Sequence, residues 1–369
     1  MNMYKADRQY LFITGLLFIA GLLCAAVCAL VLPVKALAEA SAPWPVKVVV
    51  VSMFEDGALS GDDPGEFQFW VERMPLGKEW DFPLGMYPMR SNSDGVLALC
   101  TGGGIPNATA SIMALGLDPR FDLSRAYWLI AGIAGGDPED VSLGSAVWAR
   151  HIVDGDLLYE IDAREIPDGW PYGLIPLGAK SPAQVPEDIS TGWTLDTIHF
   201  PLNASLANWA YQLTRDHPVA DSAGLREFRS LYSALPKAQL QPLVMMGDTL
   251  SASTYWHGAR LNHWANDWVK LYGGKDAEFV TTNMEDSGTL TALHRLARLG
   301  HVDVNRVMVL RTVSNFSMPP PDKPASWSVT APYPEEGVPA LEAAWQVGSR
   351  VVRQIVQDWK TARDQIPGS

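Results

Sequence analysis

The chain has little cysteine and little positive charge. Three of its 369 residues are cysteine, and 28 lysines and arginines stand against 41 aspartates and glutamates, which gives a formal net charge of −13. A surface this acidic repels phosphate backbones, so we expect no nucleic-acid partner. Cys100 is the only cysteine beyond the first forty residues, so we expect no disulfide and a fold that is held together by its core.

Long uncharged apolar runs are absent except near the start of the chain. There, Lys5 and Arg8 precede the apolar run 11–32, and Ala-Leu-Ala at 36–38 places small residues where a signal peptidase cleaves. We therefore expect residues 1–38 to be a secretory signal peptide and the protein to be periplasmic or secreted. The run is long enough to span a bilayer, so an uncleaved membrane anchor is the competing interpretation.

Short apolar runs alternate with helical patterns through the rest of the chain. Buried strands that alternate with helices predict an α/β layered fold with a mostly parallel sheet. We expect residues 39–369 to form a single domain, with 154–240, rich in proline, glycine and tryptophan, as an elaboration of it. The expected strands are 46–51, 95–101, 126–133, 145–153, 243–246, 278–282 and 304–313, and the expected helices are 107–117, 204–215, 223–234, 285–299 and 339–365.

Functional groups in such folds gather where strands end at their carboxyl side. The glycine turn at 102–104 lacks the third glycine and the acidic residue of a dinucleotide site. His257 and His263 lie six apart on an expected helix and do not share a face, so we expect no metal, and we expect no cofactor. The segments after the expected strands are 52–57, 101–107, 132–136, 246–249, 282–286 and 311–315.

These six segments, in this order, resemble the nucleoside phosphorylase and nucleosidase superfamily. They supply its glycine turn, Ala-Gly-Gly turn, Gly-Asp turn, Met-Glu pair and final Arg-x-x-Ser-Asn. Met-Phe-Glu-Asp, Ile-Ala-Gly-Gly-Asp-Pro, Gly-Asp-Thr and Asn-Met-Glu-Asp-Ser-Gly are more specifically similar to the purine nucleoside permease family, over about residues 46–360. The resemblance implies a nucleoside-phosphorylase-like three-layer fold with a mostly parallel or mixed sheet, and a purine nucleoside as ligand.

The resemblance also implies roles for single residues. Glu285 would hold the ribose 2′- and 3′-hydroxyls, since one carboxylate accepts two hydrogen bonds, and Met284 would pack beneath the sugar. Asn315 stands where the family places an Asp or Asn against the base, and Glu55 lies near the carboxylate that orients water in the hydrolytic members. The remaining expected substrate-binding residues, taken from the same motifs, are Asn283, Asp248, Thr249, Gly103 and Gly135.

Simpler explanations compete with three of these roles. Glu285 could cap the helix that follows it, because a carboxylate is favourable at a helix N-terminus. Glu55 could belong to a solvated turn, and Asp248 could hydrogen-bond its own turn.

Two functions from different classes remain open. One is a periplasmic protein that binds purine nucleosides and passes them to an inner-membrane transport partner; the other is an exported nucleosidase that releases the free base. Phosphorolysis is disfavoured because the glycine turns carry no arginine for phosphate, and only Arg90 or Arg311 could reach in. Asn315 cannot act as a general acid but can donate to purine O6 or N7, which hints at 6-oxopurines. A homo-oligomer that completes the cleft is expected from the family.

Overall fold

A mixed sheet of ten strands runs through the computed structural model, which describes residues 42–183, 185–189 and 196–369. The expected signal segment 1–38 lies outside these residues. The strands of the main sheet are β2 (Val48–Ser52), β3 (Lys78–Trp80), β4 (Met89–Ser91), β5 (Val96–Cys100), β7 (Tyr127–Gly136), β8 (Ala146–Asp154), β11 (His199–Pro201), β12 (Val244–Ser251), β13 (Phe279–Asn283) and β14 (Val307–Phe316). Two small sheets pair β1 (Trp44–Pro45) with β6 (Phe121–Asp122) and β9 (Leu158–Glu160) with β10 (Leu174–Pro176).

Five strands of the main sheet close into a ring. β8 pairs with β12, β12 with β13, β13 with β7, β7 with β14, and β14 returns to β8. The β13–β7 and β14–β8 pairs are antiparallel, whereas the other three pairs of the ring are parallel. From β7 the sheet continues through β2, β5, β4 and β3, and β11 extends it beyond β8. The sheet is therefore mixed, with a closed part and an open part.

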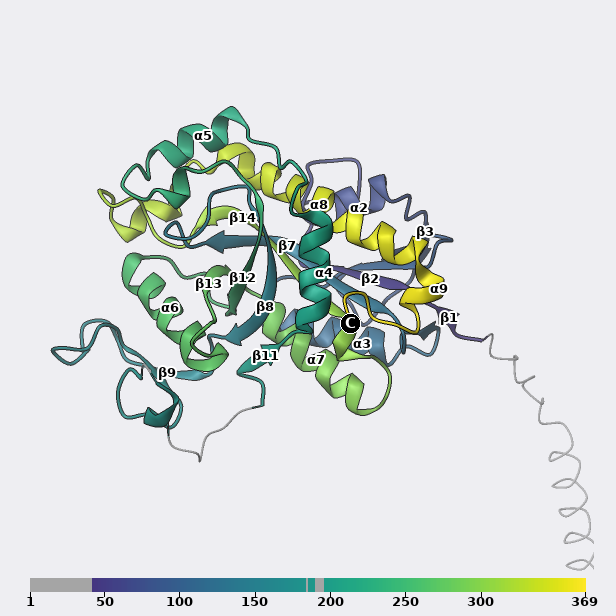
Figure 1. Ribbon diagram of the computed structural model, residues 1–369, viewed down its shortest axis with the longest axis horizontal. Helices are drawn as coiled ribbons and strands as arrows, with labels where there is room; N and C mark the ends of the chain where they lie inside the picture. The colour runs from purple at the N-terminus through teal and green to yellow at the C-terminus, as the bar shows by residue number, and fades with distance from the viewer. Residues whose placement is uncertain (1–41, 184, 190–195) are drawn as a thin grey trace, which may run out of the picture. The chain divides into compact units, whose positions relative to one another are not determined.

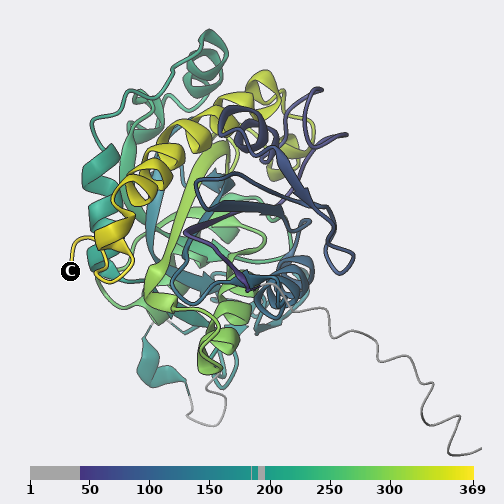
Figure 2. The same ribbon diagram turned by 90° about the vertical axis from the view of Figure 1, so that its right-hand side faces the viewer.

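Helices cover both faces of the open part (Figures 1 and 2). Val48 and Val50 of β2 belong to the core cluster that includes residues of α2, α4 and α8, and Val49 and Val51 belong to the cluster of α3 and α7. This alternation is what a strand buried on both faces requires, and it confirms the predicted three-layer α/β fold. The helices are α2 (Gln68–Arg73), α3 (Ile105–Gly116), α4 (Ala204–Thr214), α5 (Ala223–Ser230), α6 (Ala259–Gly273), α7 (Asp286–Arg298), α8 (Val338–Gln357) and α9 (Trp359–Ala362).

Two further clusters belong to the ring. α6 packs its tryptophans against β12 and β13, and α5 packs against β8, β13 and β14. The 3-10 turns between these elements are η1 (Pro186–Asp188), η3 (Lys237–Gln239), η4 (Val304–Arg306), η5 (Ala325–Val329) and η6 (Pro334–Gly337).

The structure changes several predicted boundaries. The strand expected at 243–246 continues to Ser251, and the last helix ends at Gln357 before the short α9. The elaboration 154–240 supplies β11 and α4, and α4 is tied to the ring because Trp148 Nε1 donates to Thr214 Oγ1 at 2.9 Å. No helix of the described residues combines the length and apolarity needed to cross a membrane.

A glycine allows the first turns of α3 and α7 to approach each other closely. A methyl group on Gly288, in the first turn of α7, would stand 2.5 Å from the carbonyl oxygen of Ile105, the first residue of α3. Only a residue without a side chain allows this approach. The close contact places the glycine turn before α3 beside the Met-Glu pair before α7.

Candidate nucleoside site

Glu285 lies where the starts of α3 and α7 meet. Its side chain is buried, and its Oε1 accepts a hydrogen bond from the backbone N–H of Gly104 at 3.1 Å. Although Glu285 occupies the N-cap position of α7, its side chain makes no capping hydrogen bond to that helix. Glu285 therefore does not cap the helix by a side-chain hydrogen bond, although its carboxylate still lies at the helix N-terminus, where a negative charge is favourable. The carboxylate points across to the glycine turn before α3.

The Asn283 side chain, and not that of Glu285, accepts hydrogen bonds from the N-terminal N–H groups of α7, and it orients the turn that carries Glu285. Its Oδ1 accepts hydrogen bonds from the backbone N–H groups of Glu285 at 3.1 Å and Asp286 at 2.9 Å. Its Nδ2 donates to Thr249 Oγ1 at 2.8 Å, and Thr249 in turn donates to the Thr281 carbonyl at 3.0 Å. Both side chains are buried and support Glu285; whether either touches a substrate stays a prediction.

Arg311, on β14, is the cation of the site and is buried. Its guanidinium binds both carboxylate oxygens of Asp286, with Nε to Oδ2 at 3.1 Å, and Nη1 donates to the Ile133 carbonyl at 3.0 Å. Nη2 lies 3.4 Å from Glu285 Oε2. Burial raises the pKa of Glu285, and the nearby Arg311 charge opposes that rise. Arg311 is therefore occupied by protein carboxylates and is not a free phosphate ligand.

Glu66 completes the cluster and was not found from the sequence. Its two carboxylate oxygens accept hydrogen bonds of 2.7 Å from the backbone N–H groups of Met53 and Ile133. Burial raises the pKa of Glu66 to about 8; the charge of Glu285 adds to this rise and Arg311 opposes it. In the sequence Glu66 is one of several acids in the loop before α2, and it is the one nearest to the start of that helix. We call Glu66, Glu285, Asp286 and Arg311 the charge cluster.

Glu55, the acid that the sequence favoured, builds the turn that carries Glu66. Its carboxylate accepts hydrogen bonds from the backbone N–H groups of Gly65, of Phe67 at 2.9 Å and of Gln68 at 2.6 Å. The side chain is only 7% exposed, so the solvated-turn alternative is wrong. Its predicted role in orienting water is untested.

Asn315 and Gly135 lie together at the ends of β14 and β7. The two residues pair across the strands, and a methyl group on Gly135 would stand 3.2 Å from Asn315 Nδ2 and 3.0 Å from Thr282 Cγ2. Asn315 Nδ2 donates to the Phe316 carbonyl at 3.3 Å, and its Oδ1 accepts from Ser314 Oγ at 3.0 Å. The half-buried amide therefore has hydrogen-bonding capacity left for a ligand.

Three other predicted residues have distinct surroundings. Gly103 is exposed, and a methyl group placed on it would lie 4.0 Å from Glu285 Oε1, so it borders the charge cluster. Met284, directly before Glu285 in the sequence, is half-buried, and its backbone N–H donates to Glu285 Oε2 at 3.2 Å; whether its side chain packs beneath a sugar stays a prediction. The Asp248 carboxylate is buried and is occupied by Arg150 Nη2 at 3.0 Å and by the N–H groups of His151 at 3.0 Å and Glu278 at 2.8 Å. These bonds tie β8, β12 and β13 together.

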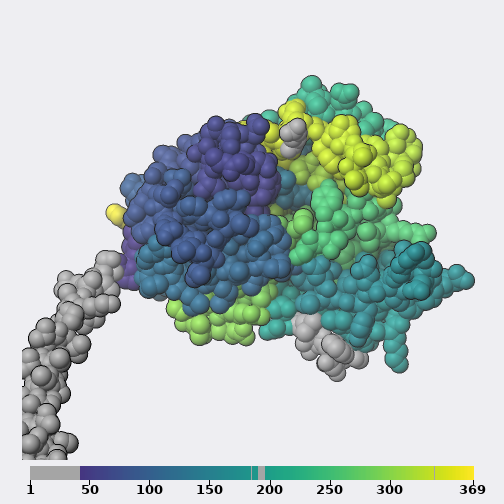
Figure 3. All heavy atoms as spheres, turned by 180° about the vertical axis from the view of Figure 1, so that it is seen from behind, coloured from purple at the N-terminus to yellow at the C-terminus, as the bar shows by residue number. Residues whose placement is uncertain are grey.

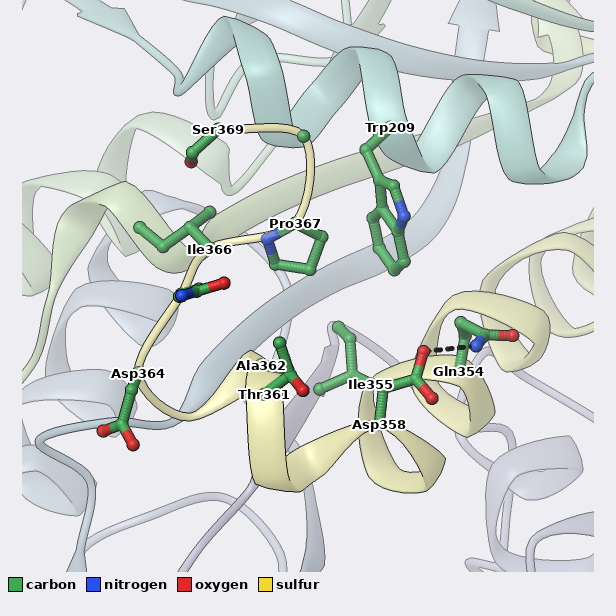
Figure 4. Close-up of a pocket in the computed structure, with 12 residues that line it drawn as sticks. Trp209, Gln354, Ile355, Asp358, Thr361, Ala362, Asp364, Ile366, Pro367 and Ser369 are labelled. Carbon is green, nitrogen blue, oxygen red and sulfur yellow. Dashed lines mark hydrogen bonds between the residues drawn. The ribbon is translucent and has the colours of Figure 1, made fainter.

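A separate cavity lies away from the charge cluster. It has a volume of about 640 Å³ and is enclosed by α4, α8, α9 and the C-terminal tail, with Trp209 facing Pro367 (Figure 4). None of its lining residues belongs to the charge cluster.

On the face drawn in Figure 3, the purple-to-blue N-terminal half meets the green and yellow C-terminal half along a seam. The charge cluster likewise joins Glu66 of the first half to Glu285 and Arg311 of the second.

Comparison with known proteins identifies the family of the chain. The sequence model of the family described as purine nucleoside permease (NUP) matches residues 45–367. The chain belongs to the purine nucleoside permease family. A purine nucleoside permease of Candida albicans is 33% identical over 306 residues, which cover 79% of this chain and 74% of that protein. A protein of Schizosaccharomyces pombe, described as a probable purine nucleoside permease, is 30% identical over 271 residues, with coverage of 72% and 76%.

Solved structures support the superfamily fold. The 5′-methylthioadenosine/S-adenosylhomocysteine nucleosidase of Neisseria meningitidis superposes with a TM-score of 0.50 at 15% identity, covering 84% of this chain and 99% of that one. A futalosine hydrolase mutant of Helicobacter pylori gives a TM-score of 0.50 at 14% identity with coverage of 84% and 99%. At such identities the likeness establishes the nucleoside-phosphorylase-like fold alone.

Proposed function

We propose that this protein binds purine nucleosides outside the cytoplasm and that Glu285 holds the ribose. The family suggests the ligand, and the direction of the Glu285 side chain supports the site. Its carboxylate turns away from its own helix toward the glycine turn before α3, and the Gly104 N–H fixes it there at 3.1 Å. A buried, oriented carboxylate accepts two hydrogen bonds from vicinal hydroxyls, each worth about 1.5–3 kcal/mol when the acceptor is charged.

Arg311 supports this role electrostatically. A buried carboxylate tends to take up a proton, and it would then lose its charge and accept hydrogen bonds more weakly. The guanidinium, 3.4 Å from Glu285 Oε2, opposes the burial-driven rise of the Glu285 pKa. Asn283 and Thr249 hold the turn in place by hydrogen bonds of 2.8–3.1 Å. The site is thus organised before a nucleoside arrives.

The location and the partners are part of the proposal. The signal-like segment 1–38 suggests export to the periplasm or the medium, where binding would be the first step of uptake. Uptake then needs a membrane transport partner that accepts the nucleoside. A second copy of the chain that completes the cleft is the proposed assembly, as the family resemblance implies. Cell fractionation and N-terminal sequencing of the purified protein test the export and cleavage steps.

The binding experiment compares Glu285→Gln with wild type by isothermal titration calorimetry. Wild type is expected to bind inosine more tightly than 2′-deoxyinosine, because the deoxy sugar lacks one hydroxyl. Glu285→Gln is expected to weaken inosine binding by about 10- to 100-fold and to remove most of this discrimination. Glu227→Gln, an exposed glutamate on α5, is the matched control. Wild-type affinity and discrimination in the Glu285 variant would refute the ribose role.

A nucleosidase is the second candidate, and Glu66 is the observation that favours it. Cleavage of an N-glycosidic bond develops positive charge on the sugar, which Glu285 would stabilise, and needs a base to activate water. Glu66 is a second buried carboxyl; burial raises its pKa to about 8, near the pH at which a general base works, and the charge of Glu285 adds to the rise. Phosphorolysis is less favoured because Arg311 is bound to Asp286 and Arg90 is bound to Glu79 at 2.8 Å.

Chromatography of reaction mixtures separates the two candidates. The protein is incubated with inosine, adenosine or guanosine, with and without phosphate, and free base is measured. Tight binding without base release supports the uptake role alone. Phosphate-independent release that Glu66→Gln abolishes supports the nucleosidase. Release that requires phosphate would overturn the argument from the occupied arginines.

A further inference from the structure

His257 lies against the end of β14, beside the predicted base contact. The sequence analysis placed His257 on a helix, but the structure places it two residues before the start of α6. The next residue, Gly258, donates its backbone N–H to the Ser317 carbonyl at 2.9 Å. The imidazole itself lies near the carbonyl of Phe316. Phe316 is the last residue of β14 and Asn315 directly precedes it, so His257 and Asn315 both lie at the end of this strand.

The imidazole of His257 has unmet hydrogen bonds. Both ring nitrogens are shielded from solvent, and neither forms a well-aligned hydrogen bond with any described residue. A buried polar atom left without a partner costs about 1–3 kcal/mol, so such atoms are rare in folded proteins. Burial also lowers the pKa of His257 to about 4, with the Phe316 carbonyl opposing the effect. At neutral pH the ring is therefore uncharged, with one N–H donor and one acceptor nitrogen.

The Phe316 carbonyl assigns these two functions to the ring nitrogens. A carbonyl oxygen only accepts hydrogen bonds, and this one already takes the Asn315 amide at 3.3 Å. It favours the tautomer in which the nitrogen facing it carries the proton. The other nitrogen of His257 is then an acceptor and needs a donor that no described residue provides. The second N–H of the Asn315 amide remains available to donate.

We propose that His257 recognises the purine base by accepting a hydrogen bond from its ring N–H, while Asn315 donates to the neighbouring exocyclic oxygen. This inference rests on the proposed nucleoside binding. A 6-oxopurine nucleoside presents N1–H and O6 side by side and fits this acceptor–donor pair. Adenosine places an acceptor at N1, which would face the acceptor nitrogen of His257. His257 is thus a specificity-determining residue for the base.

The test measures dissociation constants for inosine, 1-methylinosine and adenosine by calorimetry on the full-length protein. Wild type is expected to bind inosine at least about tenfold more tightly than either of the others, the value of one hydrogen bond. His257→Phe keeps the shape of the ring without its nitrogens and is expected to weaken inosine about tenfold and adenosine little. His257→Gln restores an acceptor and is expected to recover part of the preference. Glu285→Gln is the control that weakens all three nucleosides alike.

Each outcome bears on a different claim. If wild type binds 1-methylinosine and inosine equally well, the proposal fails without any variant being needed. An equal loss for all three nucleosides in His257→Phe assigns a purely structural role to the residue and overturns it as well. If wild type binds no nucleoside, the proposed function fails and this inference falls with it. If His257→Phe loses the preference for inosine over adenosine but still binds inosine more tightly than 2′-deoxyinosine, the proposed role of His257 is supported.

Discussion

The proton on Glu66 gives a prediction about stability. The pKa of this buried carboxyl is raised from a usual value of 4.5 to about 8 in the folded chain. A group that holds its proton more tightly when folded contributes fully to stability below pH about 4.5. That contribution is lost as the pH rises to about 8. The full loss corresponds to up to about 5 kcal/mol, at about 1.4 kcal/mol for each tenfold change in proton affinity.

Glu66→Gln removes this dependence because glutamine does not titrate. At pH 5 the variant is expected to be less stable than wild type by about 1–3 kcal/mol, since its amide nitrogen cannot accept one of the two backbone hydrogen bonds, from Met53 and Ile133. Between pH 5 and pH 8.5 the difference in unfolding free energy is expected to move in favour of the variant by several kcal/mol. Urea unfolding followed by tryptophan fluorescence, at five pH values, measures it.

Controls separate this effect from the general pH dependence of the protein. Glu227→Gln changes an exposed glutamate and is expected to give a profile parallel to that of wild type. The raised pKa of Glu285 contributes to the wild-type slope as well, but it is present in both proteins and largely cancels in the difference. A Glu66→Gln profile that runs parallel to wild type from pH 5 to 8.5 would refute the reasoning.

Two further substitutions test the architecture of the site. Gly135→Ala would place a methyl group 3.0 Å from Thr282 and 3.2 Å from Asn315. We therefore expect the free energy of unfolding, measured in urea, to fall by about 1–3 kcal/mol and inosine binding to weaken. Gly77→Ala, with open space around the added methyl group, is the control, and equal effects of the two substitutions would contradict the crowding argument. Arg311→Met leaves the buried carboxylates of Glu285 and Asp286 without their cation, so we expect the free energy of unfolding in urea to fall by about 3–5 kcal/mol at pH 7. The destabilisation is expected to be smaller at pH 5, where the unpaired carboxylates take up protons more readily. A destabilisation that does not change with pH would contradict the electrostatic explanation.

The secondary structure could be predicted because it depends on local pattern. The runs 46–51 and 95–101 are mostly apolar, with Lys47 the one charged residue, and both became strands within one or two residues of the expected bounds. The closure of the ring could not be predicted in the same way. The antiparallel pairs β13–β7 and β14–β8 join segments far apart in the sequence, and their register depends on how whole faces pack.

The site could be predicted only where a motif names its residue. Glu285 was predicted from its Met-Glu pair; the structure places its carboxylate against the Gly104 N–H, and its role toward a ribose stays a prediction. Glu66 was missed because sequence alone does not tell which of several acids in a glycine-rich loop turns inward; Glu55 was nearer the strand, and its carboxylate binds the loop backbone. Arg311 was seen as a phosphate candidate, because its partner Asp286 is recognisable only once the strand and the helix are placed together.

The charge cluster bears on the choice between binding and cleavage. Glu66, Glu285 and Asp286 surround a single guanidinium, so with every group ionised the buried site would carry two excess negative charges. A proton on Glu66, whose pKa is about 8, removes one of them at neutral pH. Protonated Glu66 leaves Glu285 free to accept hydrogen bonds from a ribose, but it cannot take a proton from water. If Glu285 holds the ribose as proposed, this protonation state at neutral pH suits the binding of a nucleoside and not its cleavage. Hydrolysis would require Glu66 to ionise, either at higher pH or through positive charge that develops on the sugar.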